Sequence, residues 1–384
     1  MQAIEFILWC STGIVLYTYG IYPIIIYILS LFRKRISKIE NDDHFPTVSV
    51  VISVYNEENI LSEKINNIFL LDYPKNKIEF IFGSDGSNDK TNSILSGISV
   101  SNIKAEQFSM RTGKANVLNR LIPRASGEII LFSDANTMYD KSSIRKLVKH
   151  FQDPTIGGVC GELRLMVNRK VVGEIGETSY WQYESFLKNV ESKYKTLIGA
   201  TGGVYAIRKS LFRPLPVSKA IVDDFLIPLE VVRRGYRMIY EPEAVAYEDA
   251  VGSVVGEFRR KVRIGASNFN GISEFVDLLH PRWGFVAFAL WSHKIIRWLA
   301  PFFLIMIFCL SMILAYSSDY YRLYYYSQLI FIVMGMIGYI FEKKKISLGI
   351  FGFPYYFIAM NLALFIGFFK SVFGLQRATW DIYR

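Results

Sequence analysis

Cysteine and histidine are scarce in this 384-residue sequence, which limits the chemistry that it can support. The three cysteines, Cys10, Cys160 and Cys309, lie far apart, form no CxxC pair and have no histidine beside them. That pattern argues against a disulfide framework and against a zinc site, and it indicates a reducing compartment. Four scattered histidines likewise argue against a histidine-based metal centre.

Two nucleotide-binding signatures are also missing. No GxGxxG follows the first β-rich run of the central region, and no GxxxxGK[ST] is present, which argues against a dinucleotide site and a P-loop. Charged residues make up only 20 % of the chain against 51 % hydrophobic residues, yet the formal net charge is +10. This balance fits a membrane protein with a substantial polar domain better than a soluble enzyme.

The first long apolar run, residues 4–31, exceeds the ~20 residues that a helix needs to cross a bilayer. Residues 1–5 contain no lysine or arginine, so the basic start of a signal peptide is missing. Four basic residues follow the run: Arg33, Lys34, Arg35 and Lys38. Because basic flanks favour the cytosolic side, we predict a retained transmembrane anchor at residues 1–35, with the next domain in the cytosol.

Another membrane-associated region is predicted at residues 281–384. Three apolar runs, each about one membrane thickness long, lie at residues 295–316, 323–341 and 346–369. Residues 282–294 mix aromatic, basic and apolar side chains and predict an interfacial helix. One span before the domain and three after it would place three basic residues outside, against the positive-inside trend: Lys370, Arg377 and Arg384. A re-entrant last segment or a doubled first one would remove this conflict.

Residues 45–280 have a different pattern, in which short apolar runs alternate with amphipathic stretches. The apolar runs predict strands at residues 47–54, 78–82, 103–108 and 128–132. Apolar residues at helical spacing predict helices at residues 57–71, 114–122 and 142–151. The alternation predicts an α/β domain with a doubly wound, mostly parallel sheet, flanked by transmembrane helices.

Three of the predicted strands run into polar residues: 55–58, 84–87 and 133–136. Ligands of such sheets bind beyond the carboxyl ends of the strands. One acid at a strand end is as readily a turn residue or a helix cap. Three polar strand ends at one edge instead indicate a site where Mg²⁺ or Mn²⁺ bridges a diphosphate to carboxylates.

Five short motifs in this order resemble those of family 2 glycosyltransferases: VYNEE at 54–58, SDGS at 84–87, GKAN at 113–116, SDAN at 133–136 and DD at 223–224. They are most similar to the membrane-embedded group of hyaluronan, chitin, cellulose and poly-N-acetylglucosamine synthases. The resemblance implies a GT-A fold, a nucleotide-sugar donor, a divalent cation (Mg²⁺ or Mn²⁺) and inversion at the anomeric carbon.

The resemblance also implies roles for residues on the donor side. Tyr55, Glu57 and Asp85 would surround the nucleoside, Lys114 would approach the nucleotide portion, and Asp134 would hold the metal. Asn136 stands where many relatives have a second aspartate. Its carbonyl oxygen can bind a cation directly or through one water.

On the acceptor side, Asp224 matches the family's catalytic base, and Asp223 lies beside it. Without the resemblance, either acid would be read as the cap of a helix at 225–234. Gly202 and Gly203 resemble an acceptor-side loop, although paired glycines also suit an ordinary tight turn. Trp181 could stack on an acceptor sugar, or it could pack within the amphipathic stretch 177–189.

A basic stretch at 259–264 departs from the family pattern. Processive relatives carry Gln-x-x-Arg-Trp here, whereas this chain has Arg260 at the glutamine position, Arg263 at the arginine position and Ile264 in place of the tryptophan. Arg260 and Arg263 are expected to bind the donor diphosphate. The loss of the tryptophan leaves processivity open. The same cluster could also rest on anionic lipid.

These observations predict an integral membrane protein, by resemblance of a bacterial inner or plasma membrane, with its catalytic domain in the cytosol. The expected activity is transfer of a sugar from a UDP-sugar to a growing polysaccharide or lipid-linked glycan. Two alternatives are single addition to a polyprenyl-phosphate lipid and non-catalytic binding of nucleotide-sugars or lipids. Basic residues gather at membrane edges and beside the predicted diphosphate site, which argues against nucleic acid as a partner.

Overall fold

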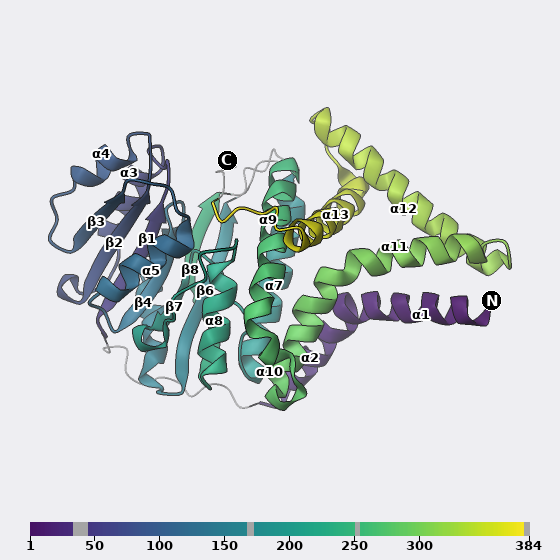
Figure 1. Ribbon diagram of the computed structural model, residues 1–384, viewed down its shortest axis with the longest axis horizontal. Helices are drawn as coiled ribbons and strands as arrows, with labels where there is room; N and C mark the ends of the chain where they lie inside the picture. Colours follow the sequence, from purple (N-terminus) through teal and green to yellow (C-terminus); the bar gives the residue numbers. More distant parts are fainter. Residues whose placement is uncertain (34–44, 167–172, 250–253, 380–384) are drawn as a thin grey trace.

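The computed structural model describes residues 1–33, 45–166, 173–249 and 254–379. Layered sheet and helices form one end of the molecule, and long helices extend away from it at the other (Figure 1). Lys34, Arg35 and Lys38, which support the predicted orientation of the first span, lie outside the described residues.

One mixed sheet contains all eight strands of the described residues, in the order β3-β2-β1-β4-β7-β6-β8-β5. The strands are β1 Val48–Val54, β2 Ile78–Asp85, β3 Ile103–Phe108, β4 Ile129–Asp134, β5 Met138–Tyr139, β6 Ile156–Met166, β7 Tyr205–Arg208 and β8 Arg237–Asp249. The first four strands are parallel, as predicted. β7 pairs antiparallel with both β4 and β6, and β6 and β8 are again parallel. The α/β prediction is confirmed, with an antiparallel strand in the middle that the sequence pattern did not indicate.

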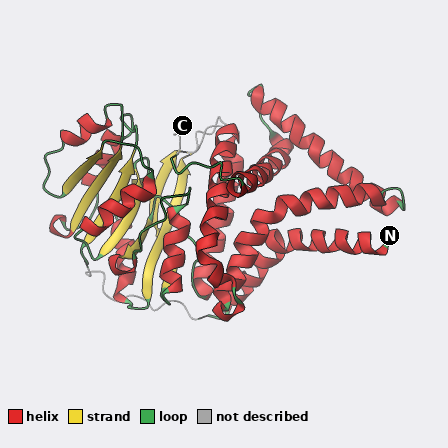
Figure 2. Cartoon of the chain, viewed as in Figure 1, coloured by secondary structure: helices red, strands yellow, loops and turns green. Residues whose placement is uncertain are grey.

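Helices cover both faces of the sheet, as the unbroken apolar runs of its strands require (Figure 2). Val51 and Ile81 face a buried cluster that includes residues of α5, α7 and α8, whereas Val50 and Phe80 face another that includes residues of α3, α4 and α6. These helices are α3 Leu61–Phe69, α4 Thr91–Ser96, α5 Lys114–Arg124, α6 Ser143–Val148, α7 Gly173–Tyr194 and α8 Asp223–Arg233.

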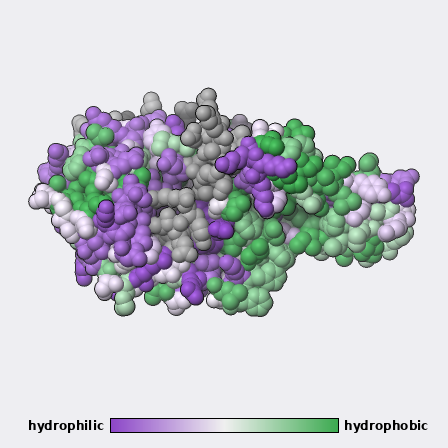
Figure 3. Space-filling view, turned by 90° about the horizontal axis from the view of Figure 1, so that it is seen from above, coloured by the Kyte–Doolittle hydropathy of each residue, from purple (hydrophilic) through white to green (hydrophobic). Residues whose placement is uncertain are grey.

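Among the residues that the structure describes, four helical runs are long and apolar enough to cross a membrane: Gln2–Leu31, Phe285–Leu314, Asp319–Lys343 and Gly349–Val372. The first comprises α1 Gln2–Leu16, a π-helical turn Tyr17–Ile21 and α2 Tyr22–Leu31; the second comprises α10 Phe285–Ala289, a π-helical segment Leu290–Ile295 and α11 Ile296–Leu314. The others contain α12 Asp319–Lys343 and α13 Gly352–Val372. Much of the segment predicted to be interfacial therefore continues into the second run without a break. Hydrophobic side chains gather over this end of the molecule and polar ones over the sheet end (Figure 3).

The last long helix returns the chain to the sheet domain. α13 packs closely on α9 Val254–Ile272, where a Cβ added at Gly367 would lie 2.9 Å from the backbone nitrogen of Ala266. Beyond it, the backbone oxygen of Ala378 lies 3.0 Å from where a Cβ of Gly113 would be, beside the start of α5. Lys370 and Arg377, which the count of spans alone would place across the membrane from the domain, thus lie in or after a helix that returns to the domain.

Candidate active site

The carboxyl ends of β1, β2 and β4 meet at one edge of the sheet, as predicted. Ser53 of β1 is in register with Asp134 of β4, and Val54 with Ser84 of β2. A pocket of about 630 Å³ lies there. Its lining runs from Tyr55 and Asp134 on the donor side to His293 and Trp298 of the second apolar run. The pocket therefore extends from the sheet edge to the membrane helices.

Lys114 connects the acids of this pocket. It is the first residue of α5, and its Nζ lies 2.8 Å from Asp134 Oδ1 and 3.2 Å from Asp223 Oδ2. Burial acts to lower the pKa of Lys114, but the two carboxylates outweigh it and hold the pKa above its usual range. The ammonium therefore stays charged, which suits a group that meets phosphate oxygens.

Asp134 and Asn136 form the part of the pocket that could hold a cation. Burial acts to raise the pKa of Asp134, but Lys114 holds it below its usual range, so the carboxylate is ionised. Asn136 donates from Nδ2 to Glu248 Oε1 at 2.5 Å, which leaves its carbonyl oxygen available as a ligand. Within the described ranges, no group of three or more His, Cys, Asp or Glu side chains is arranged for a metal. One carboxylate and one amide oxygen fit Mg²⁺ or Mn²⁺ when phosphate and water complete the shell.

The two adjacent acids occupy different environments. α8 begins at Asp223, its N-cap is Val222, and no side chain caps it, so neither acid has the capping role considered above. Asp223 accepts a hydrogen bond from the Tyr205 hydroxyl at 3.2 Å in addition to its ion pair with Lys114. Among the described residues, none makes a hydrogen bond or ion pair with the Asp224 carboxylate. Burial, followed by the charge of Asp223, raises the pKa of Asp224 above its usual range, as a proton acceptor requires.

The glycine pair leaves room for these side chains. A Cβ at Gly202 would lie 2.9 Å from Asp224 Oδ2, and one at Gly203 would lie 2.3 Å from Thr137 Oγ1. The loop before Asp224 is also fixed by its backbone, since Ala200 N donates to Asp224 O at 2.8 Å. Close approach, rather than an unusual turn conformation, therefore explains both glycines.

We expect Gly203→Ala to destabilise the fold by about 1–3 kcal/mol, because its Cβ would overlap the buried Thr137 side chain. Thermal unfolding of the purified protein measures this change. Gly97→Ala is the matched control, since its Cβ would meet no atom closer than 3.4 Å and its φ of −76° suits alanine. Equal melting temperatures for the two variants would contradict the expectation.

Asp85, predicted to contact the nucleoside, holds a neighbouring loop in the structure. It is buried, lies outside the pocket lining, and accepts hydrogen bonds from Thr112 N and Gly113 N, both at 2.7 Å. It therefore holds the loop that leads into Lys114. Tyr55 and Glu57 do line the pocket, and the Arg111 guanidinium stacks on the Tyr55 ring at 3.8 Å.

The basic residues of α9 also reach the pocket. Arg260 and Arg263 both contribute to its lining, and Arg260 Nε is 2.6 Å from Glu257 Oε2 on the same helix. The charge of Arg263 is one of those that lower the pKa of Asp134. Trp181 lines the pocket too, while packing against the second buried cluster, so both of its predicted roles remain compatible with its position.

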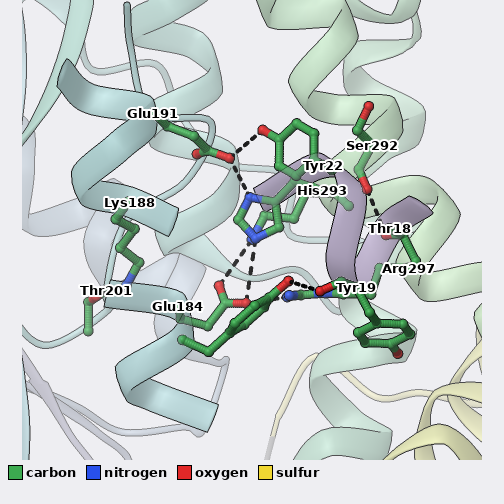
Figure 4. A network of polar contacts seen from close by, with 12 residues as sticks. Thr18, Tyr19, Tyr22, Glu184, Lys188, Glu191, Thr201, Ser292, His293 and Arg297 are labelled. Carbon is green, nitrogen blue, oxygen red and sulfur yellow. Dashed lines mark hydrogen bonds and ion pairs between the residues drawn. The ribbon is translucent and has the colours of Figure 1, made fainter. Parts of the chain in front are cut away.

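Several residues of the site carried no recognisable signal in the sequence. Lys64 of α3 is fully buried beneath the Asp134 strand end, where its Nζ donates to Ser133 Oγ at 2.8 Å. Burial lowers the pKa of Lys64 to about 7. Ala378 lines the pocket from far along the chain. A polar network also joins α7 to the membrane helices through His293 and Arg297 (Figure 4).

Comparison with known proteins identifies the class. The fold is the GT-A fold of glycosyltransferases: a mannosyltransferase from Pyrobaculum calidifontis, in complex with GDP-Man and Mn²⁺, aligns with a TM-score of 0.74. The alignment covers 96 % of this chain and 99 % of that chain at 20 % sequence identity. Residues 49–215 match the sequence model of glycosyl transferase family 2, the family whose motifs this sequence resembles.

Curated relatives match somewhat more than half of the chain. The poly-beta-1,6-N-acetyl-D-glucosamine synthase of Staphylococcus aureus (strain COL) is 27 % identical over 232 residues, which cover 58 % of this chain and 55 % of that protein. The synthase of the same name from Staphylococcus epidermidis is 24 % identical over 220 residues, or 56 % and 53 % of the two chains. This chain therefore spans about half the length of the curated relatives that it matches.

Proposed function

We propose that this protein is an inverting glycosyltransferase that moves a sugar from a nucleotide-sugar, with UDP as the expected nucleotide, to a growing polysaccharide or lipid-linked glycan. The observation that carries the proposal is the position of Lys114, paired with Asp134 and Asp223 beside Asp224 at the carboxyl edge of the sheet. A cation, an ionised metal-binding acid and an acid with a raised pKa are the groups that this displacement needs.

On the donor side, Tyr55 and Glu57 flank the nucleoside, and Asp134 with the carbonyl oxygen of Asn136 would hold Mg²⁺ or Mn²⁺. When bound, the metal neutralises charge on the leaving diphosphate. Lys114 and Arg263 add fixed positive charge near the same oxygens. Asp85 fixes the loop through which Lys114 is positioned.

On the acceptor side, Asp224 takes the proton of the attacking hydroxyl. The hydroxyl oxygen forms a bond to the anomeric carbon while the bond from that carbon to the phosphate oxygen breaks, and the nucleoside diphosphate leaves. Attack opposite the leaving group inverts the anomeric centre. Gly202 allows the reacting groups to approach Asp224 closely.

A second candidate is single addition to a polyprenyl-phosphate lipid. It is favoured by Ile264, which lines the pocket where processive relatives carry tryptophan, and by the extension of the pocket to Lys294 and Trp298 of an apolar helical run. Product sizing separates the two candidates, because a ladder or long polymer requires repeated addition. The matching synthases are bacterial, which supports a bacterial inner or plasma membrane. The proposed cytosolic side of the domain rests on the basic residues that follow the first apolar run.

The test uses the full-length protein in nanodiscs with a panel of nucleotide-sugars and Mg²⁺ or Mn²⁺. We expect one donor to release nucleoside diphosphate in a metal-dependent way and Asp134→Ala to reduce this by about 10²-fold or more, since it removes a charge that stabilises the leaving group. Asp319→Ala, at the first residue of α12, whose side chain is 94 % exposed, is the control. Full turnover by Asp134→Ala with unchanged metal dependence would contradict the assignment. Nucleotide binding without turnover across donors and acceptors would indicate a binding protein.

A further inference from the structure

One face of α7 carries three buried charged residues at helical spacing. Glu184, Lys188 and Glu191 are 5 %, 7 % and 1 % exposed, and all three line the pocket. Residues at this spacing share a face of a helix. A buried charge without a partner destabilises the folded protein. The partners of these three residues therefore indicate what each residue does.

The two glutamates are paired with the membrane helices (Figure 4). Glu184 forms an ion pair with Arg297, and Glu191 Oε1 lies 2.6 Å from His293 Nδ1 and accepts from the Tyr22 hydroxyl at 2.7 Å. Both acids therefore have partners among the described residues. They dock α7 against the first and second apolar runs.

Lys188 turns instead toward the active site. Its Nζ donates to the Thr201 hydroxyl, next to the glycine pair, and lies 5.5 Å from the centroid of the Trp181 ring. Within the described part of the chain, no carboxylate oxygen lies within 4.0 Å of this ammonium. A buried ammonium with a hydroxyl and a ring as its close partners needs a more distant negative charge to offset its desolvation.

That negative charge lies in the acids of the pocket. Asp223 on α8 and Asp134 at the end of β4 face Asp224 together with Lys114 on α5, and Tyr205 of β7 bonds to Asp223. Lys114 forms ion pairs with Asp134 and Asp223, and the charges of Lys64 and Arg263 also act on Asp134, whereas none of these described cations makes an ion pair with Asp224. Lys114 and Lys188 are the cations that act to lower the pKa of Asp224, against burial and the two neighbouring acids. Cys160 of β6, whose Sγ accepts a hydrogen bond from Thr201 N at 3.3 Å, is a further titratable group beside Lys188 and Asp224.

The same lysine is tied to Asp224 through the backbone. Thr201, which Lys188 holds, lies between Ala200, whose N–H donates to Asp224 O, and Gly202, whose Cα faces Asp224 Oδ2. A change at Lys188 can therefore reach Asp224 by two routes, through its charge and through the loop 200–203.

We propose that Lys188 is a positioning residue that supplies, from the acceptor side, a counter-charge to Asp224 and that holds the loop 200–203 against it. The membrane helices fix Lys188 in turn, through Glu184 and Glu191 on the same face of α7. The role of Asp224 as base rests on the proposed function, whereas its pairing with Lys188 does not.

The pairing is tested without catalysis by a double-mutant cycle. Melting temperatures are measured for the wild type, Lys188→Gln, Asp224→Asn and the double variant, at about pH 8.5 and about pH 5. Glutamine keeps a donor for Thr201 and removes the charge. At the higher pH, the change in melting temperature caused by Asp224→Asn should be more positive, by about 2–4 °C, in the Lys188→Gln background than in the wild type. At the lower pH, where Asp224 is protonated, the difference should disappear. Additive effects at both pH values would overturn the proposal.

The consequence for activity is tested by pH profiles of sugar transfer. Loss of the charge in Lys188→Gln should shift the acidic limb of the pH profile to higher pH by about one unit. At a fixed pH on that limb, the rate of transfer then falls about tenfold. Lys188→Arg should restore the profile, and Lys193→Gln, at an exposed residue of the same helix, should not alter it. An equal loss at every pH would indicate structural damage alone and overturn the proposal. If the wild type transfers no sugar, the proposed function fails, and the double-mutant cycle still decides the pairing.

Discussion

Asp224→Asn is expected to reduce sugar transfer by about 10²–10⁴-fold, because an amide cannot take the proton of the attacking hydroxyl. The substitution is nearly isosteric, and the contact of Ala200 with the backbone oxygen of Asp224 does not depend on the side chain. Folding and donor binding should therefore persist. The sign of the pH dependence follows from the raised pKa of Asp224: the base is active only when ionised, so transfer in the wild type rises with pH through a pKa above the usual aspartate range.

Initial rates of transfer and isothermal titration with the unreactive nucleoside diphosphate separate the two effects. Asp277→Asn is the control, since this acid lies outside the pocket, 3.7 Å from Arg233. Transfer by Asp224→Asn at the rate of that control would remove Asp224 from the mechanism. Loss of nucleotide binding together with transfer would instead point to damage of the donor site.

Arg297→Met is expected to lower the free energy of unfolding by about 3–5 kcal/mol, the usual result of breaking a buried ion pair. Arg297 and Glu184 are 7 % and 5 % exposed, and the substitution leaves Glu184 with Lys294 at 3.6 Å and His293 at 3.5 Å. The residual charge on Glu184 would then be poorly compensated where α7 meets the second apolar run.

Thermal unfolding in nanodiscs measures this effect. Arg322→Met removes an ion pair whose side chains are 50 % and 94 % exposed, and such a pair contributes at most about 1 kcal/mol. Adding Glu184→Gln to Arg297→Met should recover part of the loss, because no unpaired charge then remains buried. If Arg297→Met and Arg322→Met have the same melting temperature, the network of Figure 4 contributes little to stability.

The half of the sheet that includes β1 to β4 could be predicted because its physical signal is local. Unbroken apolar runs end at Asp134 and just before Asn56 and Gly86, both of which have a positive φ. Parallel strands must bring such ends together, so the edge followed from the pattern. The other half could not be predicted in this way: β7 has only four residues, and its antiparallel partners lie at Ile129 and Gly158, far along the chain.

The acceptor side was harder for the same reason. His293 lies in the stretch 282–294, which the sequence predicts to be interfacial, and its partner Glu191 lies just beyond the amphipathic stretch 177–189. Their pairing depends on the tertiary placement of α7 and is invisible to periodicity. Asp85 shows the opposite difficulty, since its motif indicates a ligand contact while both of its oxygens are used by the Thr112–Gly113 backbone.

The contact between Ala378 and the Gly113 loop has a consequence for biosynthesis. The strands, Lys114 and Asp224 are all translated before the last apolar run, yet one wall of the pocket is formed by a residue that follows it. A chain still emerging from the ribosome can therefore complete its sheet without completing its pocket. The donor site becomes whole only after α13 has docked on α9, so that maturation of the site waits for the membrane part of the protein.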